Sequence, residues 1–323
     1  MTEDRPIGVL LLNLGGPDSL DSVKPFLLNL FSDRMIMRFP GPAPLQSMIA
    51  WAIATARAGK SRKMYALIGG RSPLNEFTAA QARALSESLE EDGAFRVYSG
   101  MRYWRPYIPE ALREMDRDGI RRFIALSLYP HYSVATTGSA LHEVGLQIKK
   151  QKYPVSWESI DSWFDHPLYI EALADTIKQG LGSFGDDDVF VLFSAHGLPL
   201  KIAENDPYVE HIRGTIKAVT GKFPYMKYAL SYQSRTGPVK WLSPGTGDML
   251  KELGRGGTKR VLVVPVSFVS DHIETLYEID ILYKGLAAEL GIELRRAPAL
   301  NTHPLLIVAF REMILSKKKE LGW

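Results

Sequence analysis

The sequence predicts a doubly wound α/β protein, and three observations support this class. Apolar runs at 189–193 and 261–269 are rich in β-branched and aromatic residues, which is typical of strands buried on both faces of a parallel sheet. Amphipathic stretches alternate with such runs along the chain. The 323 residues are enough for about two domains, each with its own core.

Strands are expected wherever a short apolar run is bounded by turn residues, at 7–13, 95–99, 121–128, 189–194, 228–232 and 261–269. Helices are expected between them, where apolar residues recur at helical spacing, at 19–31, 76–92, 108–117, 166–182, 204–219, 247–254 and 272–290. This alternation favours parallel strands that are joined by helical crossovers.

The two halves of the chain share a weak internal similarity. Residues 9–17 resemble 189–199, and residues 118–126 resemble 256–264. The first pair of similar segments lies farther apart in the chain than the second pair. The first half therefore holds about 40 residues that the second half lacks, and this insert is expected at about 32–72. A duplication explains the similarity, although turns that recur in any α/β protein would produce part of it.

The expected insert has an unusual composition. A proline-rich start at 40–44 precedes apolar residues that include Met48 and Trp51, and a basic cluster follows at 57–63. One interpretation is a helix that covers the core. The other is an apolar lip over 40–58 for a flat ligand or a membrane surface, with cations nearby for carboxylates or lipid phosphates. The composition fits both.

The composition also excludes several classes of function. A net charge of +3 is too small to favour a nucleic-acid partner. The absence of cysteine excludes disulfides, thiolate zinc sites, cysteine nucleophiles and protein-ligated iron–sulfur clusters. No apolar run reaches the ~20 residues of a membrane span, and no secretory signal precedes the first strand, so we expect a cytoplasmic protein.

Two of the apolar runs lead directly to a histidine. His196 follows the strand at 189–194, and His272 follows the run at 261–269. Because parallel sheets bind ligands beyond the carboxyl ends of their strands, both imidazoles are expected in a site. Imidazole accepts a proton or binds a metal near neutral pH. For either histidine alone, a structural role in a hydrogen-bonded turn is the alternative.

Two carboxylates, Glu274 and Glu278, follow His272 at helical spacing. With Asp271 as the cap, Glu274 would complete a capping box, which is a purely structural alternative. That alternative leaves Glu278 unexplained, because like charges four residues apart on a helix repel slightly. A carboxylate stripe close to two histidines favours a proton relay or the passage of a metal.

The segment 101–106 places two arginines and two aromatic residues close together. Guanidinium groups bind carboxylates and aromatic rings offer flat contact, so this segment suits a planar ligand with acidic groups. A surface loop with a buried tryptophan is the alternative. The glycine loops at 15–17 and 69–73 lack the spacing of nucleotide-binding motifs, so no dinucleotide is expected.

Together these segments closely resemble the ferrochelatases, the enzymes that insert ferrous iron into a porphyrin in the last step of haem synthesis. The similar segments follow one another in order over nearly the whole chain: LLNLGGP at 11–17, GGRSP at 69–73, MRYW at 101–104, YPHYS at 129–133, TTG at 136–138, SAHGLP at 194–199, WLSP at 241–244 and SDHIETLYE at 270–278. The segment SAHGLP at 194–199, called the histidine turn, and the segment SDHIETLYE at 270–278 are together highly specific for this family.

The resemblance implies two similar Rossmann-like lobes, each a parallel sheet flanked by helices, with the active-site cleft between them. The first lobe would cover 1–158 and include a porphyrin lip at about 32–72. The second would cover 159–303 and contain the acidic helix, and a C-terminal helix at 304–323 would pack back on the first lobe.

The resemblance also implies roles for individual residues. His196 would accept pyrrole protons or bind iron, with Glu274 as its acidic partner across the porphyrin, so that these two would be the residues that contact Fe²⁺. Asp271 and His272 would support Glu274. Glu278 would continue a path for protons or metal. The residues expected to contact the porphyrin or its propionates are Met37, Tyr65, Ser72, Arg102, Tyr103 and Trp241.

Departures from the family pattern narrow these expectations. The next step of the acidic path is Leu282 here, which leaves the length of the path open. Met37 matches the protoporphyrin-using branch, whereas the coproporphyrin-using branch has a tyrosine close to Asn13, so protoporphyrin IX is the expected substrate. The alternatives are a chelatase for coproporphyrin III or cobalt, and a non-catalytic tetrapyrrole-binding protein.

The chain resembles a bacterial member in particular. It has neither the cysteines of the iron–sulfur cluster in animal members nor the transit peptide of organelle members. No permanently bound cofactor is expected, and Fe²⁺ is a substrate. The expected location is the cytoplasm, with peripheral contact at the inner face of the membrane through 40–58 as an option. No expectation follows for the oligomeric state.

Overall fold

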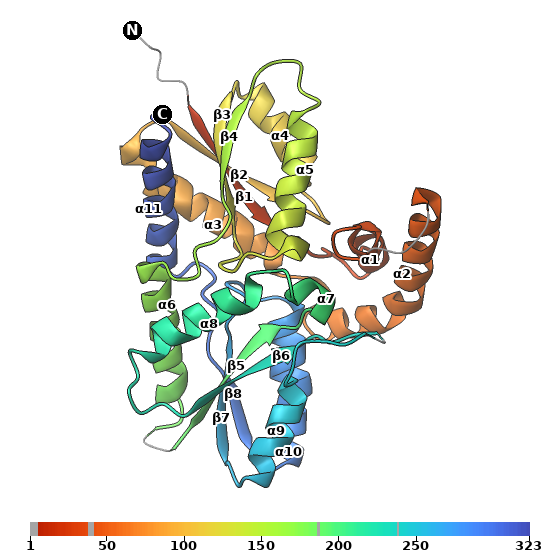
Figure 1. Ribbon diagram of the computed structural model, residues 1–323, viewed down its shortest axis with the longest axis vertical. Helices are drawn as coiled ribbons and strands as arrows, with labels where there is room; N and C mark the ends of the chain where they lie inside the picture. Colours follow the sequence, from red (N-terminus) through yellow and green to blue (C-terminus); the bar gives the residue numbers. More distant parts are fainter. Residues whose placement is uncertain (1–5, 38–41, 186–187, 238) are drawn as a thin grey trace. The chain divides into compact units, whose positions relative to one another are not determined.

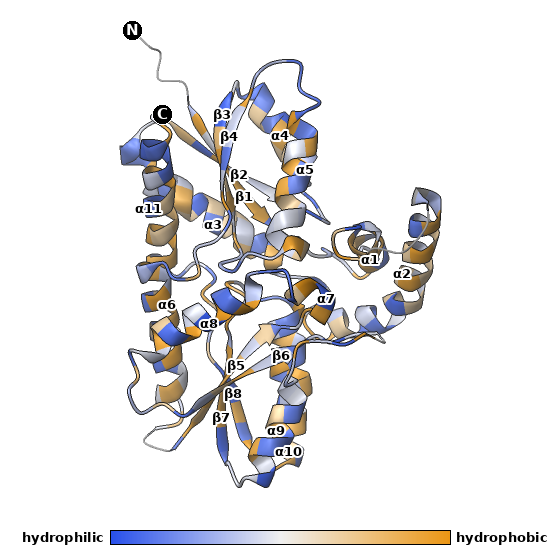
Figure 2. Ribbon diagram, viewed as in Figure 1, coloured by the Kyte–Doolittle hydropathy of each residue, from blue (hydrophilic) through white to orange (hydrophobic). Residues whose placement is uncertain are grey.

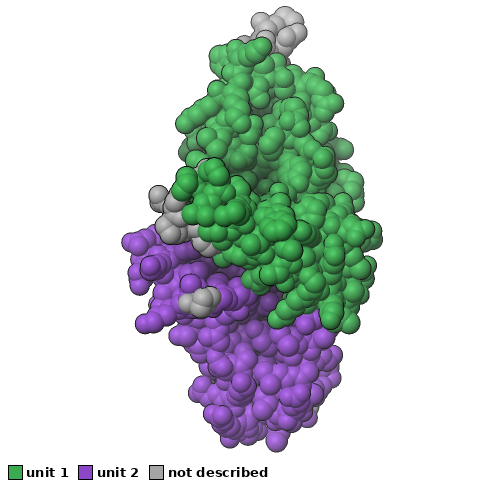
Figure 3. All heavy atoms as spheres, turned by 90° about the vertical axis from the view of Figure 1, so that its right-hand side faces the viewer, with its two compact units in different colours: residues 1–162, 307–323 green, residues 163–306 purple. Residues whose placement is uncertain are grey.

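The computed structural model describes residues 6–37, 42–185, 188–237 and 239–323, so residues 38–41 of the expected insert at 32–72 lie outside the described part, and they include the first two residues of the apolar lip expected at 40–58. Each half of the chain forms one sheet of four parallel strands with helices beside it (Figure 1). The predicted doubly wound α/β class is confirmed. The chain divides into two compact units, residues 1–162 with 307–323 and residues 163–306, called unit 1 and unit 2 (Figure 3).

The sheet of unit 1 has the strand order β2-β1-β3-β4. Its strands are β1 (Ile7–Asn13), β2 (Phe95–Met101), β3 (Arg122–Ser127) and β4 (Ser156–Ile160). Its helical segments are α1 (Val23–Ser32), α2 (Ala43–Ala66), α3 (Leu74–Ser88), η1 (Glu90–Asp92), α4 (Ile108–Arg117), η2 (Val134–Gly138), α5 (Ser139–Ile148) and most of α11 (Pro304–Glu320). The guanidinium of Arg311 on α11 pairs with both carboxylate oxygens of Asp92 at 2.6 and 2.7 Å.

The sheet of unit 2 has the equivalent order β6-β5-β7-β8, which is the order that an internal repeat predicts. Its strands are β5 (Phe190–His196), β6 (Tyr228–Gln233), β7 (Arg260–Pro265) and β8 (Glu293–Arg296). Its helical segments are α6 (Pro167–Gly182), α7 (Leu200–Ala203), α8 (Tyr208–Thr220), α9 (Thr246–Arg255), the π-helix η3 (Glu274–Tyr283) and α10 (Lys284–Glu289).

The inner strands supply the cores of both units. Every residue of β1 is buried, and β5 is buried from Val191 to Ala195. Such strands are covered on both faces, which is why they appear as unbroken apolar runs rather than alternating ones. Figure 2 shows hydrophobic residues concentrated along the strands of both sheets. These cores hold the carboxyl ends of β1 and β5 in fixed positions.

The structure differs from the predicted strands in two respects. Both β4 and β8 are absent from the prediction, because each is an edge strand whose exposed residues interrupt any apolar run. Moreover, β7 ends at Pro265 instead of residue 269. Proline has no N–H to donate to a neighbouring strand, and the chain turns immediately after it.

The α2 helix has a buried side made of small residues and an opposite side with large apolar ones. Ala50, Ala54 and Ala58 are buried, whereas Met48 and Trp51 are 62% and 54% exposed. The Lys24 ammonium lies 4.9 Å from the centre of a Trp51 ring. None of the helices in the described ranges is both long enough and apolar enough to span a membrane.

Candidate active site

His196 is the last residue of β5, at the edge of the sheet where parallel α/β proteins bind ligands. Its backbone N–H donates to the hydroxyl of Ser267 at 2.9 Å, and the N–H of Gly197 donates to the carbonyl of Gln233 at 2.9 Å. A Cβ at Gly197 would lie 2.8 Å from that carbonyl oxygen, so glycine is needed in this turn. The imidazole therefore projects from a fixed backbone, with its side chain 36% exposed.

The imidazole of His196 contacts Glu274 directly. Its Nδ1 lies 2.7 Å from Oε2 of the Glu274 carboxylate, which extends from the start of η3. The two side chains are in direct contact in this structure, and the expectation that they act from opposite sides of the porphyrin stays a prediction. With Nδ1 bonded to the carboxylate, Nε2 is the ring nitrogen that remains for a substrate. We call His196 and Glu274 the dyad.

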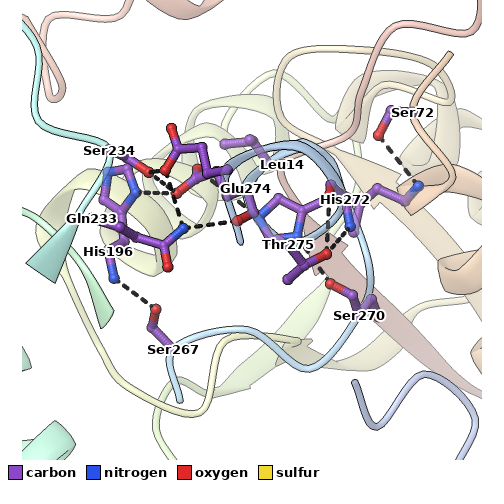
Figure 4. Close-up of polar contacts among 12 residues, drawn as sticks. Leu14, Ser72, His196, Gln233, Ser234, Ser267, Ser270, His272, Glu274 and Thr275 are labelled. Carbon is purple, nitrogen blue, oxygen red and sulfur yellow. Dashed lines mark hydrogen bonds and ion pairs between the residues drawn. The ribbon is translucent and has the colours of Figure 1, made fainter. Parts of the chain in front are cut away.

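Ser234 is a site residue that the sequence analysis does not identify. It follows β6 with a φ of 64°, a left-handed conformation that is uncommon outside glycine. Its hydroxyl contacts Glu274 (Figure 4). The same hydroxyl lies 2.7 Å from Oε2 of Glu278. A hydroxyl has one proton, so it donates to only one of these carboxylates at a time. This geometry suits a pair of carboxyl groups in which one keeps a proton of its own.

Gln233, the residue before Ser234, is a second site residue absent from the sequence-based expectations. Its side-chain amide donates to the backbone carbonyl of Glu274 at 2.9 Å and to Oε2 of Glu278 at 3.2 Å. The signal for both residues is the one that indicates His196, namely polar residues directly after a predicted strand. The expected strand at 228–232 ends just before them.

The two carboxyl groups have opposite pKa shifts. Burial disfavours ionisation of Glu274, but the charge and the hydrogen bond of His196, together with smaller contributions that include a hydrogen bond from Ser234, lower the pKa to about 2. At Glu278, burial and the negative charge of Glu274 act together and raise the pKa to about 7. Burial by itself would lower the pKa of His196, yet the Glu274 carboxylate raises it above the ordinary value. Below pH 7, one proton therefore resides on Glu278 while Glu274 is ionised.

His272 is buried and neutral beside this pair. Its Nδ1 lies 3.0 Å from the backbone carbonyl of Ser270, so Nδ1 carries the hydrogen and donates it. Burial lowers the pKa of His272 despite the nearby charge of Glu274. Its Nε2, an acceptor in this tautomer, has no hydrogen-bond partner within the described ranges and lies 3.9 Å from Oε1 of Glu274. A lone pair this close to a carboxylate suits a proton or a cation in transit.

Asp271 stabilises the loop before η3 and does not cap the helix. Its carboxylate lies 3.0 Å from a guanidinium nitrogen of Arg296 and accepts a hydrogen bond from the Thr275 hydroxyl at 2.9 Å. Within the described ranges, the residue before η3 makes no side-chain capping hydrogen bond, and the Glu274 carboxylate is bonded to His196. The capping-box alternative for Glu274 is therefore wrong, and Asp271 supports Glu274 only through the backbone that carries both.

The acidic residues lie on a π-helix rather than on the single α-helix predicted for 272–290. The described chain forms η3 over Glu274–Tyr283 and continues as α10. π-Helical turns are rare and occur frequently at functional sites. Both Glu274 and Glu278 reach Ser234 from η3, whereas Leu282 is 49% exposed and adds no carboxylate.

Arg102 and Tyr103, two of the expected porphyrin contacts, meet at Asp33 within unit 1. The Arg102 guanidinium lies 3.0 Å from Asp33 and 3.8 Å from Glu143, and the Tyr103 hydroxyl donates to Asp33 at 2.6 Å. The pKa of Asp33 is below its ordinary value. Burial alone would raise this pKa, but hydrogen bonds from Ser139 and Tyr103 and the charge of Arg102 lower it. Arg102 is thus already paired in this structure, and Tyr103 is 1% exposed.

Three further expected contacts also lie in unit 1. The N–H of Ser72 donates to the carbonyl of Pro17 at 2.8 Å, which ties two glycine loops together. A Cβ at Gly16 would lie 2.4 Å from the Ser72 side chain, so the close approach requires glycine. Tyr65 is buried near the end of α2, and Met37 is half-buried after α1.

Trp241 is the expected porphyrin contact that unit 2 places beside the histidine turn. It forms an isolated bridge with Pro199, and its ring would lie 3.6 Å from a Cβ at Gly197. Its indole Nε1 is buried and has no hydrogen-bond partner within the described ranges. Unit 2 thus brings together His196, Glu274, Glu278, His272 and Trp241, with Asp271 supporting the loop, while the other five expected residues lie in unit 1.

Among the described residues, no group of three or more histidine, aspartate or glutamate side chains is arranged to hold a metal ion. The dyad residues are bonded to each other, and His272 adds a single acceptor nitrogen. Such a set offers a cation fewer ligands than the four or more of a structural site.

Comparisons with known proteins find relatives over nearly the whole chain. The family model described as Ferrochelatase matches residues 6–318. A ferrochelatase from Geotalea uraniireducens is 51% identical over 311 residues, covering 95% of this chain and 96% of the relative. A ferrochelatase from Geobacter metallireducens is 51% identical over 309 residues, with the same coverage of 95% and 96%. The solved structure of SirB from Bacillus subtilis with Fe3+ shares the fold, with a TM-score of 0.57 and 11% identity over 98% of this chain and 97% of that one. The chain therefore belongs to the ferrochelatase family.

Proposed function

We propose that this protein inserts ferrous iron into protoporphyrin IX to form haem, with His196 as the principal base. Family membership supports the reaction class. The observation that supports the residue assignment is the 2.7 Å contact between Nδ1 of His196 and the Glu274 carboxylate. In the neutral imidazole Nδ1 holds the hydrogen of this contact, so Nε2 holds the lone pair that accepts a proton.

The dyad performs the proton transfer as a unit. Nε2 of His196 takes a proton from a pyrrole N–H, whose electron pair stays on the porphyrin nitrogen. The imidazolium that forms is stabilised by the adjacent carboxylate of Glu274, whose low pKa keeps it ionised throughout. Loss of two such protons leaves the porphyrin as the dianion that binds Fe²⁺.

Glu278 and His272 act after this first transfer. Glu278 titrates near neutral pH, so it can both receive a proton and release it. Ser234 connects it to Glu274 by hydrogen bonds to both. Nε2 of His272 and the Glu274 carboxylate offer transient ligands to the entering Fe²⁺, because imidazole and carboxylate both bind divalent iron.

The substrate is tested by anaerobic incubation of the protein with Fe²⁺ and either protoporphyrin IX or coproporphyrin III, followed by visible absorbance. We expect the metalloporphyrin spectrum to develop faster with protoporphyrin IX. Faster reaction with coproporphyrin III would overturn the substrate assignment. Porphyrin binding without a metalloporphyrin spectrum, with Fe²⁺ or with Co²⁺, would support a non-catalytic tetrapyrrole-binding protein instead.

The porphyrin would also contact the residues expected from the resemblance, among them Met37, Tyr65, Ser72, Arg102, Tyr103 and Trp241. Trp241 has the strongest support, because its ring lies beside the histidine turn. Replacing Trp241 with Leu should weaken porphyrin binding, as measured by fluorescence titration, since an aromatic surface is lost. Unchanged affinity would remove Trp241 from the binding site.

A peripheral membrane contact in the cytoplasm is part of the same proposal. The exposed Met48 and Trp51 on α2 and the basic cluster at 57–63 combine apolar contact with positive charge. The protein should therefore float with vesicles that contain anionic lipid, and Trp51→Ser should reduce this fraction. Leu67→Ser is the matched control, because Leu67 is 62% exposed outside 40–58. Equal loss in both variants would contradict a contact through the lip.

A further inference from the structure

Unit 2 contains a cavity that shares no residue with the dyad. Its volume is about 340 Å³, and α8, the edge strand β6 and residues 243–244 form its lining. Ile216, Leu230 and Pro244 provide apolar walls. A volume of this size is at the lower end of the range for small-molecule sites, about 300–1,000 Å³.

Two cations on α8 border this cavity. Arg213 and Lys217 are four residues apart, so they lie on one side of the helix. Both are exposed, and neither forms an ion pair or a side-chain hydrogen bond with any residue in the described ranges. Like charges at this spacing repel, so an anion bound between them would relieve the repulsion.

Tyr232 on β6 lines the same cavity. The residue as a whole is 4% exposed, but its hydroxyl is accessible to solvent and forms no hydrogen bond with the described residues. An accessible tyrosine hydroxyl can donate a hydrogen bond to a bound ligand. Arg213 is near enough for its charge to act on this hydroxyl. The cation and the unpaired donor thus converge on one place.

We propose that this cavity binds a phosphate monoester with a small, flat apolar group. The phosphate dianion would bind between the two cations and accept a hydrogen bond from Tyr232, because charge-assisted hydrogen bonds are the strongest available here. The apolar group would cover Leu230 and the ring of Tyr228, which is 47% exposed. Inorganic phosphate alone would leave this apolar wall in contact with water. The site is independent of the chelatase reaction, since none of its residues belongs to that machinery.

Isothermal titration calorimetry with phenyl phosphate tests the proposal, using the full-length protein without porphyrin. We expect saturable binding at one site per chain. Arg213→Gln should weaken it at least ~10-fold through loss of a charged donor, and Tyr232→Phe by ~5-fold through loss of one hydrogen bond. Lys251→Gln, which removes an exposed cation on α9 outside the cavity, should leave the affinity unchanged. Circular dichroism checks that each variant is folded.

Inorganic phosphate and benzoate complete the titration series. Both should bind at least ~10-fold more weakly than phenyl phosphate, because the first lacks the apolar group and the second carries a single negative charge. The proposal is overturned if phenyl phosphate shows no saturable binding up to millimolar concentration. It is also overturned if Arg213→Gln binds as tightly as the parent protein, or if inorganic phosphate binds equally well.

Discussion

Nδ1 of His196 lies 2.7 Å from Oε2 of Glu274, and this contact links the end of a central strand to the first turn of a π-helix. The two residues are 78 positions apart in the chain, yet they form one hydrogen-bonded pair, which we propose acts as a single base. The carboxylate determines which ring nitrogen carries the hydrogen, and it stabilises the charge that appears when the other nitrogen is protonated.

Replacing Glu274 with Gln should lower the pKa of His196 and slow haem formation. Glutamine keeps the shape of the side chain but removes the negative charge that offsets the burial of the imidazole. We expect a loss of about 10²-fold in the initial rate, within the range for a disrupted acid–base group. NMR titration of the His196 ring measures the pKa, and Glu252→Gln on the exposed face of α9 is the control. An unchanged His196 pKa in Glu274→Gln would contradict the coupling.

Glu278→Gln should make stability less dependent on pH. The pKa of Glu278 is about 7 in the folded protein against 4.5 ordinarily, so the folded state holds the proton more tightly. The stabilisation from this proton is complete below pH 4.5 and is lost as the pH rises through 7. Glutamine resembles the protonated form at every pH.

The comparison of unfolding free energies at pH 5 and pH 8 measures this effect. The parent protein should lose about 1–3 kcal/mol more than Glu278→Gln over this interval. His196 contributes in the same direction in both proteins, because its pKa is also raised. Equal losses in the two proteins would show that Glu278 is ionised in the fold at neutral pH.

Ser234→Ala and Ser234→Gly separate the hydroxyl of Ser234 from its backbone conformation. Both remove the hydrogen bond to the carboxylates, so both should raise the pKa of Glu278 and slow haem formation to a similar extent. Only glycine adopts a φ of 64° without strain, so the Gly variant should be more stable than the Ala variant by about 1 kcal/mol. Urea unfolding and initial rates measure the two effects. A rate restored by glycine would mean that the conformation matters and the hydroxyl does not.

Arg102→Ala should destabilise the protein even without porphyrin. Asp33 is 8% exposed, and removal of Arg102 leaves its negative charge poorly compensated. We expect a loss of about 2–4 kcal/mol in the free energy of unfolding, measured by urea titration. In an Asp33→Asn background the same substitution should cost less, because the buried charge is already gone. An identical cost in both backgrounds would show that the pair does not stabilise unit 1.

All four inner strands and the edge strands β2 and β6 were predictable, whereas the edge strands β4 and β8 were not. β1 and β5 are covered on both faces, so burial selects an unbroken apolar run that is visible in the sequence. β8 has the residues Glu-Leu-Arg-Arg, of which Leu294 is the single buried one. One buried residue in four does not distinguish a strand from a loop.

The neighbourhood of His196 and Glu274 was predictable from the sequence, but Gln233, Ser234 and the direct contacts were not. His196 and Glu274 could be identified because polar residues after buried strands mark the edge where ligands bind. The direct bond between them depends on the π-helical turn of η3 and on the loop that follows Pro265, and neither has a signal in residue spacing. Ser234 depends on a left-handed backbone, which sequence predicts well only for glycine.

The rate of haem formation by His196→Ala, measured anaerobically with saturating Fe²⁺ and protoporphyrin IX, tests the central claim most directly. Porphyrin affinity, measured in parallel by fluorescence, should stay within a few-fold of the parent value, because the imidazole serves chemistry more than binding. The rate should fall by about 10²–10⁴-fold. A rate near that of the parent protein, with porphyrin binding intact, would contradict the assignment of His196 as the base.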